Sequence, residues 1–218
     1  MGIDKKERFS AFSHFAGAVG AFFGLILLII MCKGQVDLML ACFVYGLCVM
    51  FLFTSSGIYH IKKKSDDEVS FWRKLDHLAI FFMIAGTYTV TSYIYMPGYW
   101  KLGIILAQWT LVLLGVFFKF FWLKSPRFFS TMIYLLMGWM ALLPIKELFV
   151  SMGRIEFLLL FLGGVAFSVG AFVYIFKKPN FWPNRIGFHG LFHVFILLGG
   201  LLHFIMVVIA INKCTNFF

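Results

Sequence analysis

The stretch that decides the fold is GFHGLFHVFILLGGLLHFIMVVIAI, residues 187–211. Apart from its histidines it carries no ionisable side chain, and it exceeds the roughly 20 residues with which a helix crosses a bilayer. An ionisable residue is expensive to keep in such a segment, so it usually has a function. His189 and His193 stand four residues apart, which places both imidazoles on one face of a helix. The stretch predicts a membrane helix that begins with a pair of metal-ligand side chains.

The composition extends this interpretation to all 218 residues. Hydrophobic residues make up 62% of the chain and charged residues only 13%, which is typical of a protein embedded in lipid. Short connections separate seven apolar stretches, at about 15–32, 38–60, 77–99, 102–118, 128–145, 157–176 and 188–211. We expect an all-α membrane protein in which residues 1–218 form one seven-helix transmembrane bundle. Pro144 is expected to end or kink the fifth helix.

The 19 basic residues are distributed unevenly over the connections. Most lie in the amino-terminal tail and in the second, fourth and sixth loops, which predicts a cytoplasmic amino terminus and a carboxyl terminus outside. The net charge of +10 also draws this face toward anionic phospholipid head groups. Nucleic acid binding is not expected, because the three lysines 62–64 are followed at once by acidic residues at 66–68. The five basic residues of the other side are Lys33, Lys101, Lys146, Arg154 and Lys213.

Ionisable side chains gather at the predicted cytoplasmic ends of the helices, although they lie far apart in the sequence. They are His14, His60, Asp76, His77, His189 and His193. Three imidazoles, those of His60, His189 and His193, form the three-ligand set of a catalytic zinc site, whose fourth position is left for water. Asp76 opens the third predicted helix at the same depth and is a general base in this scheme. Ser56 precedes His60 by one helical turn and orients the water or donates to a developing oxyanion.

Plainer roles remain open for several of these residues. His14 and His77 either support the ligands or bond a carbonyl or a lipid phosphate at the head-group boundary. Asp76 is also placed to cap the third helix, and Ser56 to bond the backbone of its own helix. His203 lies deep in the seventh helix, where we expect it to form a hydrogen bond between packed helices.

These motifs, in this order, closely resemble the haemolysin III branch of the progestin and adipoQ receptor family. The matching blocks are Glu7 with 9–17, Ser56-x-x-x-His60, 73–77 followed by 84–89, and His189-x-x-x-His193 with Gly199 and His203. The resemblance covers nearly the whole chain. In one departure, Val90 stands where the family usually has proline after Gly-Thr-Tyr-Thr, which leaves the shape of the third helix open.

The resemblance implies seven helices with a cytoplasmic amino terminus and a zinc ion held by His60, His189 and His193. It also implies a zinc-bound water contacted by Asp76, with Ser56 close by, and a location in the plasma membrane of a bacterium. The wider group is similar to alkaline ceramidases, so we expect hydrolysis of a lipid amide or ester, with an acylated membrane lipid as substrate. Two alternatives are a membrane-lytic or pore-forming haemolysin and a zinc-stabilised receptor or scaffold. The sequence sets neither the substrate nor the oligomeric state.

Overall fold

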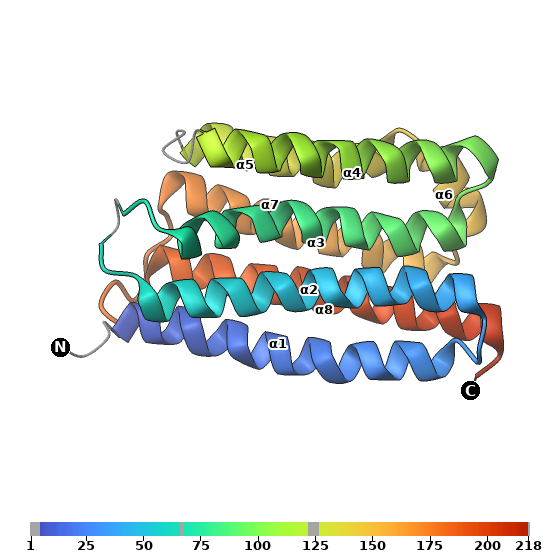
Figure 1. Cartoon of the computed structure of the whole chain (residues 1–218), viewed down its shortest axis with the longest axis horizontal. Coiled ribbons are helices and arrows are strands. Elements are labelled where there is room, and N and C mark those ends of the chain that lie inside the picture. Colours follow the sequence, from blue (N-terminus) through green and yellow to red (C-terminus); the bar gives the residue numbers. More distant parts are fainter. Residues whose placement is uncertain (1–4, 66–67, 122–126, 218) are drawn as a thin grey trace.

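A computed structural model describes residues 5–65, 68–121 and 127–217. Over these residues the chain folds into helices that lie side by side in one bundle (Figure 1). The helices are α1 (Lys5–Met31), α2 (Val36–Lys62), α3 (Phe71–Tyr95), α4 (Gly98–Phe121), α5 (Arg127–Gly138), η1 (Trp139–Leu142), α6 (Ile145–Ser151), α7 (Arg154–Phe176) and α8 (Gly187–Thr215). We call the end where α1, α3, α5 and α8 begin the amino-terminal end of the bundle, and the end where α1, α3 and α8 stop the carboxyl-terminal end (Figure 1).

The described residues contain six helices long and apolar enough to cross a membrane, namely α1, α2, α3, α4, α7 and α8. Residues Phe128–Leu142 and Ile145–Ser151 make a seventh span if this pair, bent by 56°, is counted as one. The predicted all-α membrane bundle is confirmed. The break falls at Pro144, directly before α6, as predicted for a residue that has no amide donor to continue a helix.

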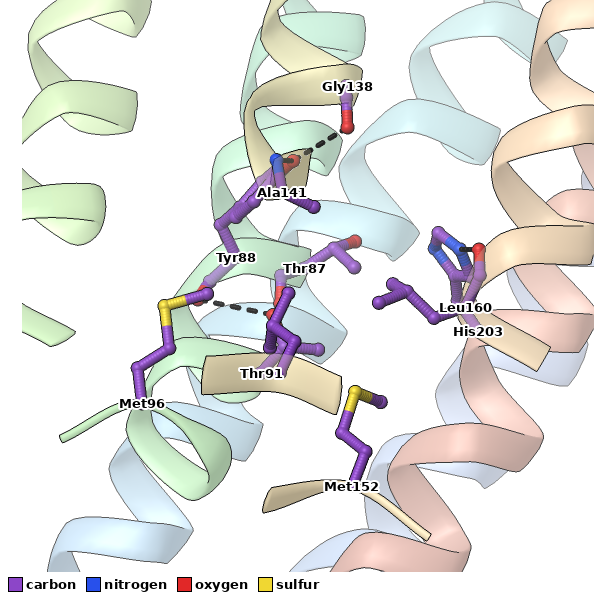
Figure 2. A pocket seen from close by; sticks show the side chains of 10 residues that line it. Thr87, Tyr88, Thr91, Met96, Gly138, Ala141, Met152, Leu160 and His203 are labelled. Atoms are coloured by element: carbon purple, nitrogen blue, oxygen red, sulfur yellow. Dashed lines mark hydrogen bonds between the residues drawn. The ribbon is translucent and has the colours of Figure 1, made fainter. Parts of the chain in front are cut away.

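The bend is supported by a side chain from α3. The hydroxyl of Tyr88 donates to the carbonyl of Gly138 at 2.6 Å and accepts from the amide of Ala141 at 2.7 Å (Figure 2). Backbone groups freed where α5 tightens into η1 have no water available inside a membrane, so they need partners from the protein. Tyr88 supplies partners for two of them.

Two helices begin at least six residues earlier than the apolar stretches that predicted them. α1 starts at Lys5 rather than at 15, and α3 starts at Phe71 rather than at 77. In the first turns of α1, Glu7, Ser10 and His14 recur at helical spacing on one face, and the last two are buried. A search for apolar runs does not register such polar turns, although they face the bundle.

The start of α3 changes the position of Asp76. Ser70 caps this helix, because its side chain accepts a hydrogen bond from the amide of Arg73 at 3.2 Å. Asp76 therefore lies in the second turn and does not serve as the cap. α3 continues unbroken through Val90, which is completely buried, so the absence of proline at this position leaves a continuous helix.

Close helix packing fixes the elements that carry the predicted site. A Cβ atom at Gly86 of α3 would lie only 2.7 Å from Cβ of Cys48 in α2, so this glycine allows the two helices to approach. Gly24 of α1 has the same relation to Phe204 of α8, with 2.9 Å to the ring. The core formed there joins α1, α2, α3 and α8, which carry all of the predicted site residues. This packing fixes the positions of the helix ends that carry the predicted site residues.

Candidate metal centre

Three imidazoles meet at the amino-terminal end of the bundle. His60 lies in the last turn of α2, and His189 and His193 lie in the first two turns of α8. Nε2 of His189 is 3.2 Å from Nε2 of His60 and 3.1 Å from Nε2 of His193. One ring nitrogen from each of the three residues lies within 4.8 Å of the other two, and His60 and His193 are buried. Two distant chain segments thus direct three nitrogens toward one point.

The spacing of these nitrogens fits a tetrahedral metal ion. Zinc–nitrogen bonds of about 2.0–2.1 Å at the tetrahedral angle would hold the ligand nitrogens ~3.3 Å apart. The separations of 3.2 and 3.1 Å are close to that value. Three imidazoles with one position left open are also the donor set of catalytic zinc sites, as in carbonic anhydrase. Two of the three ligand separations therefore match those of a three-histidine zinc site, and the residues present fit this ion.

Glu7 of α1 orients one of the three rings. Its Oε2 lies 2.5 Å from Nδ1 of His60, and its Oε1 lies 2.6 Å from Nζ of Lys63. Because Nδ1 is engaged by the carboxylate, Nε2 is the nitrogen of His60 left for a metal. No role was predicted for Glu7, since it lies before the apolar stretch. The available signal was its spacing from Ser10 and His14 on one helical face.

Asp76 and Ser56 lie together on the α2–α3 side of the centre. Ser56 and Asp76 are near enough to interact electrostatically, and so are Asp76 and His60. Ser56 is buried and Asp76 is half-buried. Ser56 of α2 thus lies near Asp76 of the neighbouring helix α3, beside the histidines. This arrangement can hold and deprotonate a water molecule.

His14 packs against the metal centre. The backbone carbonyl of His77, in contrast, is hydrogen-bonded to α5. The His14 ring stacks on His193, with ring centroids 3.7 Å apart and planes inclined by 16°. It is buried, and neither of its nitrogens has a hydrogen-bond partner among the described residues. The head-group role is therefore wrong for His14. The carbonyl of His77 accepts a hydrogen bond from Tyr134 of α5 at 3.2 Å, which connects α3 with α5.

His203 belongs to a separate polar region in the middle of the bundle (Figure 2). Its Nε2 donates to the carbonyl of Leu160 in α7 at 3.2 Å, which confirms its predicted role between packed helices. With Thr87 and Tyr88 it lines a cavity of about 30 Å³, large enough for a water molecule. Ten residues of α8, or about 15 Å, separate it from His193. His203 is therefore not part of the metal centre.

Comparison with known proteins covers almost the whole chain. The family described as haemolysin-III related matches residues 4–204. The chain is 33% identical over 207 residues to the "Hemolysin-3 homolog" of Bacillus subtilis (strain 168), and the match covers 93% of each protein. It is 34% identical over 205 residues to "Hemolysin-3" of Bacillus cereus, covering 93% of this chain and 90% of that protein. No solved structure matches. The family match includes every residue of the metal centre.

Proposed function

The chain belongs to the haemolysin-III-related family, and from this premise we propose that it is a zinc-dependent membrane hydrolase acting on an amide or ester bond of an acylated lipid. The observation that carries the proposal is the convergence of three Nε2 atoms, with separations of 3.1 and 3.2 Å, near the carboxylate of Asp76. A purely structural zinc site usually uses four protein ligands. Among the described residues, the group that could hold a metal consists of three histidines, without a fourth protein ligand.

The chemistry divides between the ion and the side chains. When bound, zinc supplies a Lewis acid that polarises a carbonyl and makes a water molecule nucleophilic at neutral pH. Asp76 accepts the proton that the attacking water loses, and then gives it to the departing amine or alcohol oxygen. Ser56 lies close to the same carboxylate and is placed to donate to it. Water is consumed, and the products are a fatty acid and an amine or alcohol.

The depth of the centre suits a lipid substrate. The histidines occupy the last turn of α2 and the first two turns of α8, where a lipid carries the bonds that join its acyl chains to its head group. An acyl chain can therefore stay in the bilayer while its amide or ester reaches the three nitrogens. The many exposed apolar side chains of these helices offer it an apolar surface.

The basic loops support an orientation for this site. We infer that the amino-terminal end faces the cytoplasm and the anionic head groups of the inner leaflet, because most lysines and arginines lie in the helix ends and connections at that end. Both relatives named above come from bacteria of the genus Bacillus. The plasma membrane of a bacterium is accordingly the expected location.

Metal content is the first test. Elemental analysis of the detergent-purified protein should find about one zinc ion per chain in the wild type and far less in the His189→Ala and His193→Ala variants. The matched control is His203→Ala, a histidine of the same helix outside the centre, which should retain zinc. Zinc that survives both ligand substitutions would exclude the site.

Turnover is the second test. Incubation with a panel of acylated lipids should release fatty acid in the wild type, and Asp76→Asn should lose this release while keeping its zinc. If chelation unfolds the bundle and no lipid is ever cleaved, zinc is structural and the scaffold alternative holds. Dye-loaded vesicles in the same assay address lysis: dye escape without fatty acid release would favour the lytic alternative.

A further inference from the structure

A second hollow lies at the end of the bundle opposite the metal centre. It has a volume of about 490 Å³ and is formed by the end of α3, the start of α4, and α6. Figure 1 shows these elements together at the carboxyl-terminal end. The break at Pro144 turns α6 by 56° and places Lys146 in the same hollow as Lys101 of α4. We call this hollow the Lys101–Lys146 pocket.

The pocket holds two lysines against one acidic residue, Glu147, which leaves an excess of positive charge. Of the basic residues at this end, Lys213 pairs with Glu156, and Lys33 donates to the carbonyl of Asn216 at 2.7 Å. The ammonium groups of Lys101 and Lys146, in contrast, form no ion pair or hydrogen bond with the residues that the structure describes. Nζ of Lys101 lies over the ring of Tyr93, 4.8 Å from its centroid, which holds the ammonium group at the pocket wall.

Glu147, the acidic residue of the lining, is hydrogen-bonded to a tryptophan. Oε1 of Glu147 accepts a hydrogen bond from Nε1 of Trp100 at 3.0 Å. The rest of the lining is largely apolar, with Ile94, Met96 and Val150 among its members. Val150 is 79% exposed, so this wall opens toward the membrane surroundings of α6. The pocket thus combines two ammonium groups with an apolar wall.

We propose that the Lys101–Lys146 pocket binds the phosphate of an anionic phospholipid head group. Two ammonium groups at the end of a transmembrane bundle stand at the depth where lipid phosphates lie, and each attracts the negative charge of an anionic head group. The apolar wall contacts the glycerol and the first carbons of the acyl chains, which a free phosphate ion does not possess. The site is independent of the metal centre at the other end and requires no hydrolysis.

Binding of short-chain lipids to the purified full-length protein in a neutral detergent tests this assignment. Calorimetric titration should show dioctanoyl phosphatidylglycerol binding at least tenfold more tightly than dioctanoyl phosphatidylcholine. A basic residue near the head groups contributes about fivefold to affinity for anionic lipid, so Lys101→Gln and Lys146→Gln should each lose about fivefold and the double variant about 25-fold. Affinity for phosphatidylcholine should not change.

The matched control is Arg154→Gln, which removes an exposed positive charge at the same end but outside the pocket. It should leave phosphatidylglycerol affinity unchanged, and an equal loss in this variant would show diffuse attraction instead of a site. Equal affinity for the two lipids would overturn the proposal, and so would inorganic phosphate that binds as tightly as the lipid. If the lysine variants do not fold, Ser151→Asp adds a negative charge to the lining and should give the same selective loss.

Discussion

Replacing Glu7 by glutamine should weaken metal binding although no ligand is removed. The carboxylate lies 2.5 Å from Nδ1 of His60 and fixes which ring nitrogen faces the other two histidines. Loss of such a carboxylate partner typically lowers metal affinity about 10- to 100-fold. The Glu7 side chain is 22% exposed, so solvent screens part of the interaction. We therefore expect a loss near the lower limit, about tenfold or ~1.4 kcal/mol of binding free energy.

The assay is competition for zinc between the purified protein and a chromophoric chelator of known affinity. Glu7→Ala should lose more affinity than Glu7→Gln, because the glutamine oxygen can still accept a hydrogen bond from Nδ1 of His60. Lys63→Gln is the matched control, since it removes the other partner of Glu7 and leaves the contact with His60. It should change zinc affinity less than about threefold, because the Lys63 ammonium group contacts Glu7 and not the ligand ring.

Two results would refute this reasoning. Unchanged zinc affinity in both Glu7 variants, with far-UV circular dichroism showing an intact bundle, would mean that the carboxylate does not orient His60. A loss in Lys63→Gln equal to that in Glu7→Gln would mean that charge balance in the α1–α2 contact matters, and not the carboxylate–imidazole bond.

Three further predictions concern the catalytic group and the packing that holds it. Asp76→Asn should keep its zinc and lower the rate of fatty acid release at least about 100-fold, the usual contribution of a general base; a rate within threefold of the wild type would contradict its role. Gly86→Ala should destabilise the bundle by about 1–3 kcal/mol, because the new Cβ meets Cβ of Cys48 at 2.7 Å, whereas Gly20→Ala, with nothing within 4 Å, should be neutral in thermal unfolding. Tyr88→Phe leaves two backbone groups of the α5–η1 bend without their partner and should lower the free energy of unfolding by about 1–3 kcal/mol, and a melting temperature equal to that of the wild type would show that other groups replace the hydroxyl.

Hydropathy predicts this architecture well because lipid leaves a chain few options. A segment in a bilayer must satisfy its backbone groups internally, so an apolar run of sufficient length becomes a helix, and a proline such as Pro144 marks where it breaks. The pairing of His189 with His193 follows from helical spacing in the same way. Their meeting with His60 was predictable from depth, because helix ends of known direction lie at one face of the membrane.

The contacts between helices were harder to predict. Helical spacing shows which residues share a face, but it does not show which neighbour that face meets. The stack of His14 on His193 depends on how α1 is rotated against α8, and the bond between Glu7 and His60 depends on polar turns that precede the apolar run of α1. The Ser70 cap likewise moves Asp76 from the first residue of a helix into its second turn.

α1 therefore has a role in the metal centre that ligand counting does not reveal. It contributes none of the three ligands, yet Glu7 contacts one ligand ring and His14 covers another. A carboxylate and a buried imidazole without hydrogen bonds are costly for an isolated helix in lipid, and packing alone would be served better by apolar side chains. The ion pair with Lys63 offsets part of the cost of Glu7, and the contacts of Glu7 and His14 with two ligand rings give this polar face a second role, which is to hold those rings in a fixed orientation. The polar face of α1 is therefore an independent reason to regard the three histidines as a working centre and not as a chance cluster.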